Sequence, residues 1–297
     1  MSKRILLLVL TNLAVVFTIT LILNVFGLGH YLGGFGVNQS GLFISCLVYG
    51  FGAAFFSLAI SRFSAKTFMG VRVIDPREPG PLAELVETVH ALAQKAGLPA
   101  MPEVGVYESG EMNAFATGPT RSRALVAVSS GLLRRMGREE LEGVLGHEIA
   151  HIANGDMVTM TLLQGLINAF VLFLANLIAM AMSSRSRDDD RGGFGRNPYL
   201  VFMLQGLLSP LGFLVVAWFS RRREFRADAG GAKYAGQGKM VGALRALHHA
   251  FDRQPAEAGD SGSLATLKIA GRPSGLMALL STHPPLEERI ARLQAGA

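Results

Sequence analysis

The sequence of 297 residues is poor in charge, in tryptophan and in cysteine. Only 17% of its residues are charged and 50% are hydrophobic, whereas an ordinary soluble domain carries about 25% charged residues. A disordered chain has the opposite balance, so disorder of the whole chain is excluded. The single cysteine, Cys46, can form neither an internal disulfide nor a multi-cysteine metal site. The composition therefore indicates an integral membrane protein whose environment includes the lipid bilayer.

The net charge of +6 comes from arginines and lysines that cluster beside long apolar runs, without interleaved aromatic residues. Such an arrangement is typical of membrane anchoring and orientation, and it does not indicate nucleic-acid binding. We therefore expect no nucleic acid as a partner. The clusters are Lys3 with Arg4, Arg62 with Lys66, and the three arginines at 221–223.

No aspartate, glutamate, lysine or arginine occurs between Ile5 and Ser61. Glycines and polar residues interrupt this stretch in its middle, and each half supplies about 20 apolar residues, enough for a helix to cross the hydrocarbon core. We predict a transmembrane helical hairpin of Ile5–Phe26 and Gly41–Ile60. The first run is longer than the core of a signal peptide and no small-x-small cleavage site follows it, which favours a retained anchor.

Two further apolar runs, Met157–Met182 and Pro198–Phe219, enclose a polar loop at 183–197. Both runs contain amide side chains, which a membrane span tolerates when they face other helices or a cavity. The sequence alone leaves open whether these runs cross the bilayer fully or lie partly in it as long amphipathic helices.

The expected organisation has four parts: a transmembrane hairpin at 1–61, a polar segment at 62–156, the second apolar helical pair at 157–219, and a polar segment at 220–297. Periodicity predicts helices over 81–96 and 137–154 and strands over 103–107 and 124–129, with 113–118 as a third strand or a strand edge. The fold class expected is mainly α with a small β-sheet (α+β).

The helix at 137–154 carries two histidines four residues apart, His147 and His151, which share one helix face and can reach one metal ion. Imidazole and carboxylate ligands suit zinc in a site that keeps a position open for water. Glu148 would then take a proton from the water and give it to the leaving amine. A surface helix with one glutamate between two histidines is the alternative, but the apolar neighbours favour partial burial, where unpaired histidines are costly.

A hydrolytic zinc site needs a third protein ligand. Glu224 and Asp228 follow the last apolar run and share a helix face. Glu224 can be that ligand, with Asp228 accepting a hydrogen bond from a ligating imidazole, although the same spacing also fits a solvated charge cluster. His283 can be a helix-entry residue or a donor to the substrate oxyanion, and Arg289 can support the site from the following helix.

The order of these residues along the chain also constrains topology. If Glu224 meets the two histidines at one ion, the two apolar runs between them must return the chain to its starting side. Either both runs cross the membrane or neither does. With Lys3 and Arg4 inside, the positive-inside rule places that side in the cytoplasm.

Together these segments resemble the M48 family of membrane metalloproteases, in particular its bacterial inner-membrane heat-shock proteases. The matching pieces follow the family's order over most of the chain: NAFATG at 113–118, LEGVLGHEIAHIANGDM at 141–157, SRRREFRADAGGAKYAG at 220–236 and THPPLEERIARL at 282–293. The resemblance implies a zincin-like metalloprotease domain, formed by the two polar segments and anchored by about four membrane helices.

The resemblance also implies the residues that carry the chemistry. It implies one zinc ion per subunit, held by His147, His151 and Glu224. Glu148 would be the catalytic residue, and His283 would stabilise the transition state.

Further roles follow from the same resemblance. Asp228 would support the metal site, and an extended substrate would align along Asn113, Ala114 and Phe115. The substrates implied are proteins and peptides, mainly damaged or unassembled membrane proteins, in a multi-pass protein of the bacterial inner membrane. The polar segments at 185–197 and 254–275 also make self-cleavage an expectation once the enzyme is extracted from the membrane.

Three other functions remain open at this point. A related endopeptidase that trims prenylated (CAAX-type) C-termini shares the metal motif but has more spans around a large chamber. A transporter component or a non-enzymatic scaffold fits the apolar content. The apolar runs, however, lack the ionisable residues that mark ion pathways, and a complete set of ligands argues against a scaffold.

Overall fold

The computed structural model describes residues 39–77, 80–183, 198–252 and 281–296. The predicted first membrane helix, Ile5–Phe26, lies outside the described residues, as does nearly all of the polar loop at 183–197. The chain divides into two compact units. The apolar unit contains Met1–Ala54 and Leu162–Gly212, and the polar unit contains Phe55–Thr161 and Phe213–Ala297. The four-part organisation expected from the sequence stays a prediction.

Three long helices match three of the four predicted apolar runs: α3 (Gln39–Phe68), α7 (Asp156–Ser183) and α8 (Pro198–Ala235). Within the described residues, these three are long and apolar enough to cross a membrane. Two of them extend further than the apolar runs did, because α3 continues past Ser61 and α8 continues 16 residues past Phe219. Charged residues after the last apolar run therefore lie on the same continuous helix.

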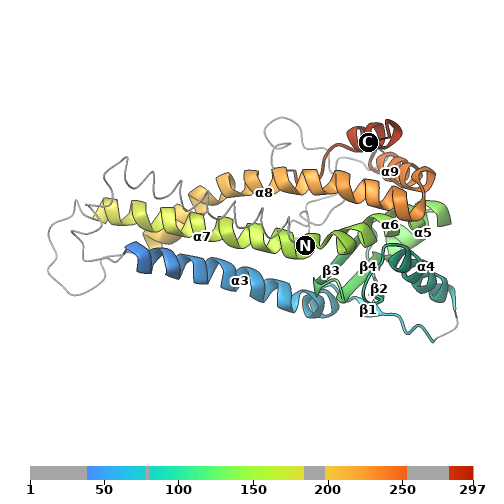
Figure 1. The fold of residues 1–297 in the computed structure, drawn as a ribbon, viewed down its shortest axis with the longest axis horizontal. Coiled ribbons are helices and arrows are strands. Elements are labelled where there is room, and N and C mark those ends of the chain that lie inside the picture. Colours follow the sequence, from blue (N-terminus) through green and yellow to red (C-terminus); the bar gives the residue numbers. More distant parts are fainter. Residues whose placement is uncertain (1–38, 78–79, 184–197, 253–280, 297) are drawn as a thin grey trace. The chain divides into compact units, whose positions relative to one another are not determined.

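Figure 1 shows the helices of the apolar unit as ribbons. These helices pack through small and large apolar side chains. Cys46 of α3 is buried in a cluster with Phe173 and Met180 of α7. A Cβ atom on Gly50 would lie only 2.6 Å from the backbone nitrogen of Ala169, so α3 and α7 approach backbone to backbone there. Such contacts through small residues are typical of helices in membranes.

The amide side chains of the third apolar run are satisfied within α7 itself. Gln164 Nε2 donates to Asn168 Oδ1 at 2.7 Å, and Asn176 Nδ2 donates to the carbonyl oxygen of Leu172 at 2.7 Å. A polar group without a partner in hydrocarbon costs several kcal/mol. These internal bonds explain how an apolar helix carries three amides.

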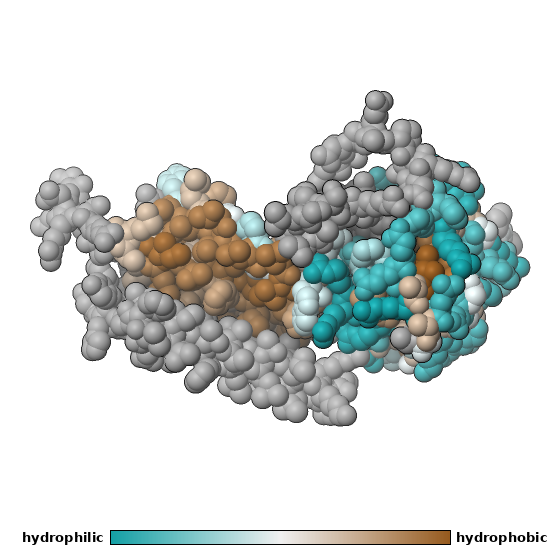
Figure 2. All heavy atoms as spheres, turned by 90° about the horizontal axis from the view of Figure 1, so that it is seen from above, coloured by the Kyte–Doolittle hydropathy of each residue, from teal (hydrophilic) through white to brown (hydrophobic). Residues whose placement is uncertain are grey.

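Large apolar side chains lie exposed along α8 from Tyr199 to Trp218, and this helix exposes no further large apolar side chain up to Ala235. Figure 2 shows apolar side chains in brown over the visible face of the apolar unit. The guanidinium of Arg222 lies 4.3 Å from the ring centroid of Trp218. A tryptophan stacked with a cation at the end of an apolar helix face is typical of a membrane–water interface.

The polar unit contains a four-stranded sheet in the order β1-β2-β4-β3. Its strands are β1 (Arg72–Val73), β2 (Glu103–Tyr107), β3 (Ala114–Thr120) and β4 (Arg123–Ser129). The central pair, β2 and β4, is parallel, and the two outer pairings are antiparallel. Strand β3 therefore forms one edge of the sheet. The strands predicted at 103–107 and 124–129 are confirmed, whereas the two-residue β1 has no periodicity to reveal it.

Among the described residues, the polar unit has five further helices: α4 (Pro81–Lys95), α5 (Ser130–Arg135), α6 (Arg138–Asn154), α9 (Gln237–Asp252) and α11 (Leu286–Gln294). Helix α6 is central, since it packs against α4, α9 and β3. Its residues Leu145, Ile149 and Ile152 are fully buried in the main core. The fold class expected from the sequence, mainly α with a small β-sheet, is confirmed.

Candidate active site

Helix α6 begins and ends at glycines that fix its position. The side chain of Glu140 accepts a hydrogen bond from the backbone nitrogen of Gly137 at 3.0 Å, which caps the start of the helix. Gly155 ends it in a left-handed conformation, with φ of 66°, where glycine is favoured because it has no side chain to clash. The two histidines of the motif lie on its last two turns and are buried.

Glycines on α8 let that helix lie close against α6. A Cβ atom on Gly231 would lie 3.0 Å from the backbone nitrogen of His147 and 2.8 Å from Met240 Sδ. A Cβ atom on Gly230 would lie 2.5 Å from the side chain of Ala150. This close approach brings the preceding turns of α8, which carry Glu224 and Asp228, to the histidines of α6.

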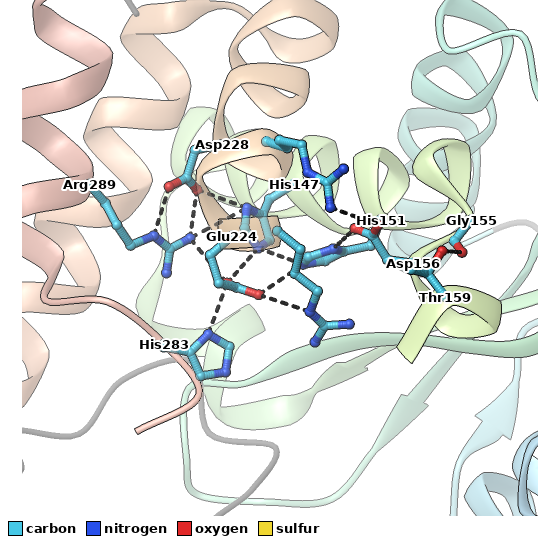
Figure 3. A network of polar contacts seen from close by, with 11 residues as sticks. His147, His151, Gly155, Asp156, Thr159, Glu224, Asp228, His283 and Arg289 are labelled. Atoms are coloured by element: carbon cyan, nitrogen blue, oxygen red, sulfur yellow. Dashed lines mark hydrogen bonds and ion pairs between the residues drawn. The ribbon is translucent and has the colours of Figure 1, made fainter. Parts of the chain in front are cut away.

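Three side chains converge on one point between the helices (Figure 3). The Nε2 atoms of His147 and His151 are 3.1 Å apart. Glu224 Oε2 is 3.4 Å from the first of these nitrogens, and Glu224 Oε1 is 3.4 Å from the second. Donors bound at 2.0–2.1 Å to a tetrahedral ion stand about 3.3 Å from one another. The spacing of these atoms therefore fits a tetrahedral metal ion.

The hydrogen bonding of Glu224 supports the same fit. Its carboxylate is completely buried, and Oε1 has no hydrogen bond, although Nε2 of His151 lies 3.4 Å from it and Nε of Arg223 lies 3.7 Å from it. The other oxygen, Oε2, lies 2.9 Å from Nδ1 of His283. A buried carboxylate oxygen without a hydrogen bond is costly, and a metal ion bound directly to it would remove more of that cost than the guanidinium of Arg223 at 3.7 Å. The structure thus brings His283 to the site through the carboxylate.

The ring nitrogen of His147 that faces away from His151, Nδ1, contacts the buried ion pair of Asp228 and Arg289. This nitrogen is 2.9 Å from Asp228 Oδ1. Arg289 of α11 donates to the same carboxylate from Nε at 2.8 Å and from Nη2 at 2.6 Å. Both partners are buried (Figure 3). Asp228 and Arg289, both expected near the site from the sequence, therefore lie in one network with the first histidine.

This network changes the acidity of the histidines. Burial alone would lower the pKa of His147, but hydrogen bonds with Asp228 and Glu224 outweigh it and raise the pKa to about 9. Burial would lower the pKa of His151 as well, but its hydrogen bond with Asp156 and the negative charge of Glu224 outweigh that effect and raise the pKa. A metal ion that binds here must displace protons from these rings.

Glu148 lies buried on α6 beside the first histidine. Burial raises the pKa of Tyr107 to about 12, and the charges of Glu111 and Glu148 act in the same direction. The side-chain oxygen of Asn113 is buried without a hydrogen bond, and its backbone pairs with Ser129 of β4. Ala114 and Phe115 follow it on the edge strand β3 and are also buried.

Sequence reasoning missed one residue of this network, Asp156. Its Oδ2 atom lies 2.8 Å from Nδ1 of His151, and both groups are buried. The residue stands directly after the glycine that ends α6, five positions beyond the histidine that it contacts. Its position next to a helix-ending glycine was the available signal, because a chain that reverses there can return a side chain to the preceding turn.

A helix with two histidines and a glutamate, facing a helix with a third ligand and joined to long apolar helices, defines a membrane-embedded metallopeptidase. Residues 80–297 match the family model described as Peptidase family M48, and the chain belongs to this family.

Full-length relatives agree with this assignment. The chain is 50% identical to a protease HtpX homolog of Methylacidiphilum infernorum, over 99% of both chains. It is 48% identical to a protease HtpX homolog of Bacillus velezensis, over 99% of this chain and 100% of the relative. It is 45% identical to the protease HtpX of Shewanella halifaxensis, over 99% of this chain and 100% of the relative.

A solved structure shares the fold. The crystal structure of S. mikatae Ste24p aligns with a TM-score of 0.60 and 21% identity, over 94% of this chain and 67% of that chain. Family, relatives and fold together establish a membrane-embedded metalloendopeptidase.

Proposed function

We propose that this protein is a zinc endopeptidase of the bacterial inner membrane that degrades misfolded or unassembled membrane proteins from the cytoplasmic side. One observation carries the metal site, namely the 3.1–3.4 Å spacing of the two imidazole nitrogens and the Glu224 carboxylate. Zinc is the proposed ion because two imidazoles and one carboxylate are the ligand set of hydrolytic zinc sites. His147, His151 and Glu224 would hold one ion per subunit.

The protein's own side chains would manage protons and charge during peptide hydrolysis. A bound zinc ion would supply Lewis acidity toward the scissile carbonyl and the attacking water. Glu148, adjacent to His147 on α6, would take the proton of the attacking water and pass it to the leaving amine. His283 is anchored through Nδ1 by Glu224, and its second ring nitrogen would donate to the oxygen that gains charge in the transition state.

The substrate would bind in extended form along β3. This strand is at the edge of the sheet, so its outer backbone groups have no neighbouring strand in the described sheet. An extended peptide can add to such an edge through main-chain hydrogen bonds. Asn113, Ala114 and Phe115 lie at the start of this edge and would align the peptide.

Metal analysis combined with proteolysis tests the proposal. The wild type and Glu148→Ala, purified at full length in detergent, should each hold about one zinc per chain, because Glu148 is not a proposed ligand. Only the wild type should cleave casein or a denatured membrane protein. Glu139→Ala removes an exposed glutamate from the same helix and should keep both properties. Metal-free wild type, or cleavage by Glu148→Ala at the wild-type rate, would overturn the proposal.

The same proteins test self-cleavage, for which the segments 185–197 and 254–275 were expected to be the targets. Both segments lie outside the described residues. The full-length wild type should shorten during incubation in detergent, whereas Glu148→Ala should stay intact. Equal degradation of both would point to a contaminating protease.

Cysteine labelling tests the proposed orientation. Gly110 is exposed in the polar unit and a side chain there meets no neighbour. Gly110→Cys in a Cys46→Ala background should react with a membrane-impermeant maleimide only after cells are opened. Labelling of intact spheroplasts would place the active site on the outer side and contradict the proposal.

A further inference from the structure

We infer that Asp156, the first residue of α7, is a positioning residue that orients His151 for the metal ion. This inference rests on the proposed metal site. The carboxylate of Asp156 and the imidazole of His151 are both buried, and Oδ2 lies 2.8 Å from Nδ1 (Figure 3).

The two histidines of the site are paired with two different carboxylates. Nδ1 of His147 faces Asp228 at 2.9 Å, and Nδ1 of His151 faces Asp156 at 2.8 Å. The Nε2 atoms of both rings point at each other and at Glu224. A carboxylate at Nδ1 keeps the proton on that nitrogen and leaves the lone pair of Nε2 for a metal ion. With Nδ1 held in this way, each ring that loses its Nε2 proton is left in the tautomer that metal binding requires.

The local backbone explains why Asp156 reaches His151. Gly155 takes a left-handed conformation at the end of α6, and α7 begins at the next residue. Thr159 donates from both its backbone nitrogen and its hydroxyl to the carbonyl oxygen of Gly155, at 3.2 and 3.1 Å, which fixes the first turn of α7. A carboxylate in the first turn of a helix is favoured by the helix dipole. The junction thus holds a charged oxygen at a fixed place beside the ring.

The two carboxylates differ in how strongly other groups hold them. Asp228 shares a bidentate ion pair with the buried Arg289. Asp156 has a weaker partner in Arg226, whose Nη2 atom is 4.0 Å from Oδ1 and whose side chain is more than half exposed. Removing Asp228 would therefore leave a buried arginine without its carboxylate and damage the fold. Replacing Asp156 by asparagine leaves no buried arginine without its carboxylate, and the new amide oxygen can still accept a hydrogen bond from Nδ1 of His151, so the change acts mainly on the histidine.

The test compares full-length wild type, Asp156→Asn, Asp156→Glu and Asp75→Asn in detergent. Asp75→Asn is the matched control, since it makes the same chemical change at an exposed aspartate of the polar unit. Four quantities are measured: the zinc dissociation constant by chelator competition, the melting temperature of the metal-free protein, and KM and kcat at saturating zinc.

For Asp156→Asn we expect zinc binding about 10–100-fold weaker than in the wild type. The metal-free melting temperature should stay within about 2 °C, and KM at saturating zinc should stay unchanged. Asp156→Glu restores the charge in a longer side chain and should bind zinc with intermediate affinity. Asp75→Asn should match the wild type throughout.

Two results would overturn the inference. Zinc affinity of Asp156→Asn within about twofold of the wild type would show that the ring needs no such partner. A loss of affinity accompanied by a lower metal-free melting temperature, equal in Asp156→Asn and Asp156→Glu, would show a structural role instead. Wild type without zinc would overturn both this inference and the proposed function, whereas a zinc-binding wild type with an unchanged Asp156→Asn would overturn the inference alone.

Discussion

In both units of the molecule, glycines allow two helices to approach closely, but the consequence of this close contact differs between the units. In the apolar unit, Gly50 lets α3 touch the backbone of α7. The nearby amides, such as Gln164 and Asn168, are satisfied within their own helix. In the polar unit, Gly231 lets α8 touch the backbone of α6 at His147. There the contact brings buried charges from different helices together instead of keeping polar groups local.

The difference follows from what each unit must satisfy. Helices in lipid gain little from hydrophobic burial against one another, so close fit of small residues supplies much of their association. The polar unit has a hydrophobic core around α6, which can offset the cost of a buried network such as Glu224, Asp228 and Arg289. A close glycine contact in the apolar unit therefore stabilises the association of its helices. A close glycine contact in the polar unit positions the charged residues of the candidate active site.

The largest expected effect on zinc binding and proteolysis comes from removing the side chains of the candidate active site one at a time. Glu224→Ala should lose most bound zinc and all proteolysis, because a ligand is gone. Asp228→Ala should bind zinc about 10–100-fold more weakly, and it should also melt at a lower temperature because Arg289 is left buried without its carboxylate. His283→Ala should keep near-stoichiometric zinc while its rate falls about 10²–10³-fold. Zinc content and kcat measured on the same preparations check this order.

A reversed order would contradict these assignments. If His283→Ala loses zinc while Glu224→Ala keeps it, His283 is the third ligand. The contact of 2.9 Å between the two side chains would then let the carboxylate of Glu224 orient His283 as a ligand.

The next effect is expected from Gly231→Val, which breaks the contact that joins α8 to α6. The added side chain would meet the backbone of His147 and the sulfur of Met240, and such overpacking costs typically about 1–3 kcal/mol. We expect lower zinc affinity together with a lower melting temperature. Gly238→Val is the control, since a side chain at that position meets no neighbour. Unchanged zinc affinity in Gly231→Val would show that the helices can separate without disturbing the ligands.

In the apolar unit, Gly50→Val should lower stability without changing the metal site. Its Cβ atom would lie within 2.8 Å of the backbone of Ala169 and of the carbonyl oxygen of Gly165, so we expect a loss of about 1–3 kcal/mol. Gly52→Val, on an open face of the same helix, should leave the melting temperature unchanged. Zinc bound per folded chain should equal the wild type in both variants. A loss of zinc in Gly50→Val would remove the distinction between the two units.

The smallest effect, on the stability of the fold, is expected from removing the partly exposed carboxylate of Glu103, which pairs with Arg62 and Lys66. Burial would raise the pKa of Glu103, but hydrogen bonds from Lys66 and Arg62 outweigh it, and the pKa is lowered. Since the folded-state pKa lies below the ordinary value of 4.5, the stability that this group adds is present above pH 4.5 and is lost as the pH falls through the folded pKa. Glu103→Gln should therefore cost less than about 1 kcal/mol at pH 7.

Melting curves at several pH values check this prediction. The difference between the wild type and Glu103→Gln should shrink as the pH falls below 4.5. Glu84→Gln removes a more exposed pair with Arg138 and should have no measurable effect at any pH. A difference for Glu103→Gln that does not change with pH would show that the charge of Glu103 is not the cause.

Much of the local structure followed from sequence patterns, and the exceptions have physical causes. Helix α6 and the strands β2 and β4 were predictable because their periodicity is strong. The ends of α3 and α8 were not, because charged residues continue these helices beyond the apolar runs. Arg62, for example, lies beyond the predicted end of the apolar run, yet it is still helical and forms an ion pair with Glu103. Hydrophobicity alone does not predict that the helix continues through such a charged residue.

The sequence by itself determined the family, the apolar helices and the residue types of the metal site, because helical spacing alone puts His147 and His151 on one face. Only the tertiary structure decided which residues, distant in the sequence, contact one another in the candidate active site. His283 reaches Glu224 across 59 positions of chain, and Asp156 serves His151 while Asp228 serves His147. Such pairings depend on where two helices cross and where one helix ends. Those features are set by close glycine contacts and a left-handed turn, which leave no spacing rule in the sequence.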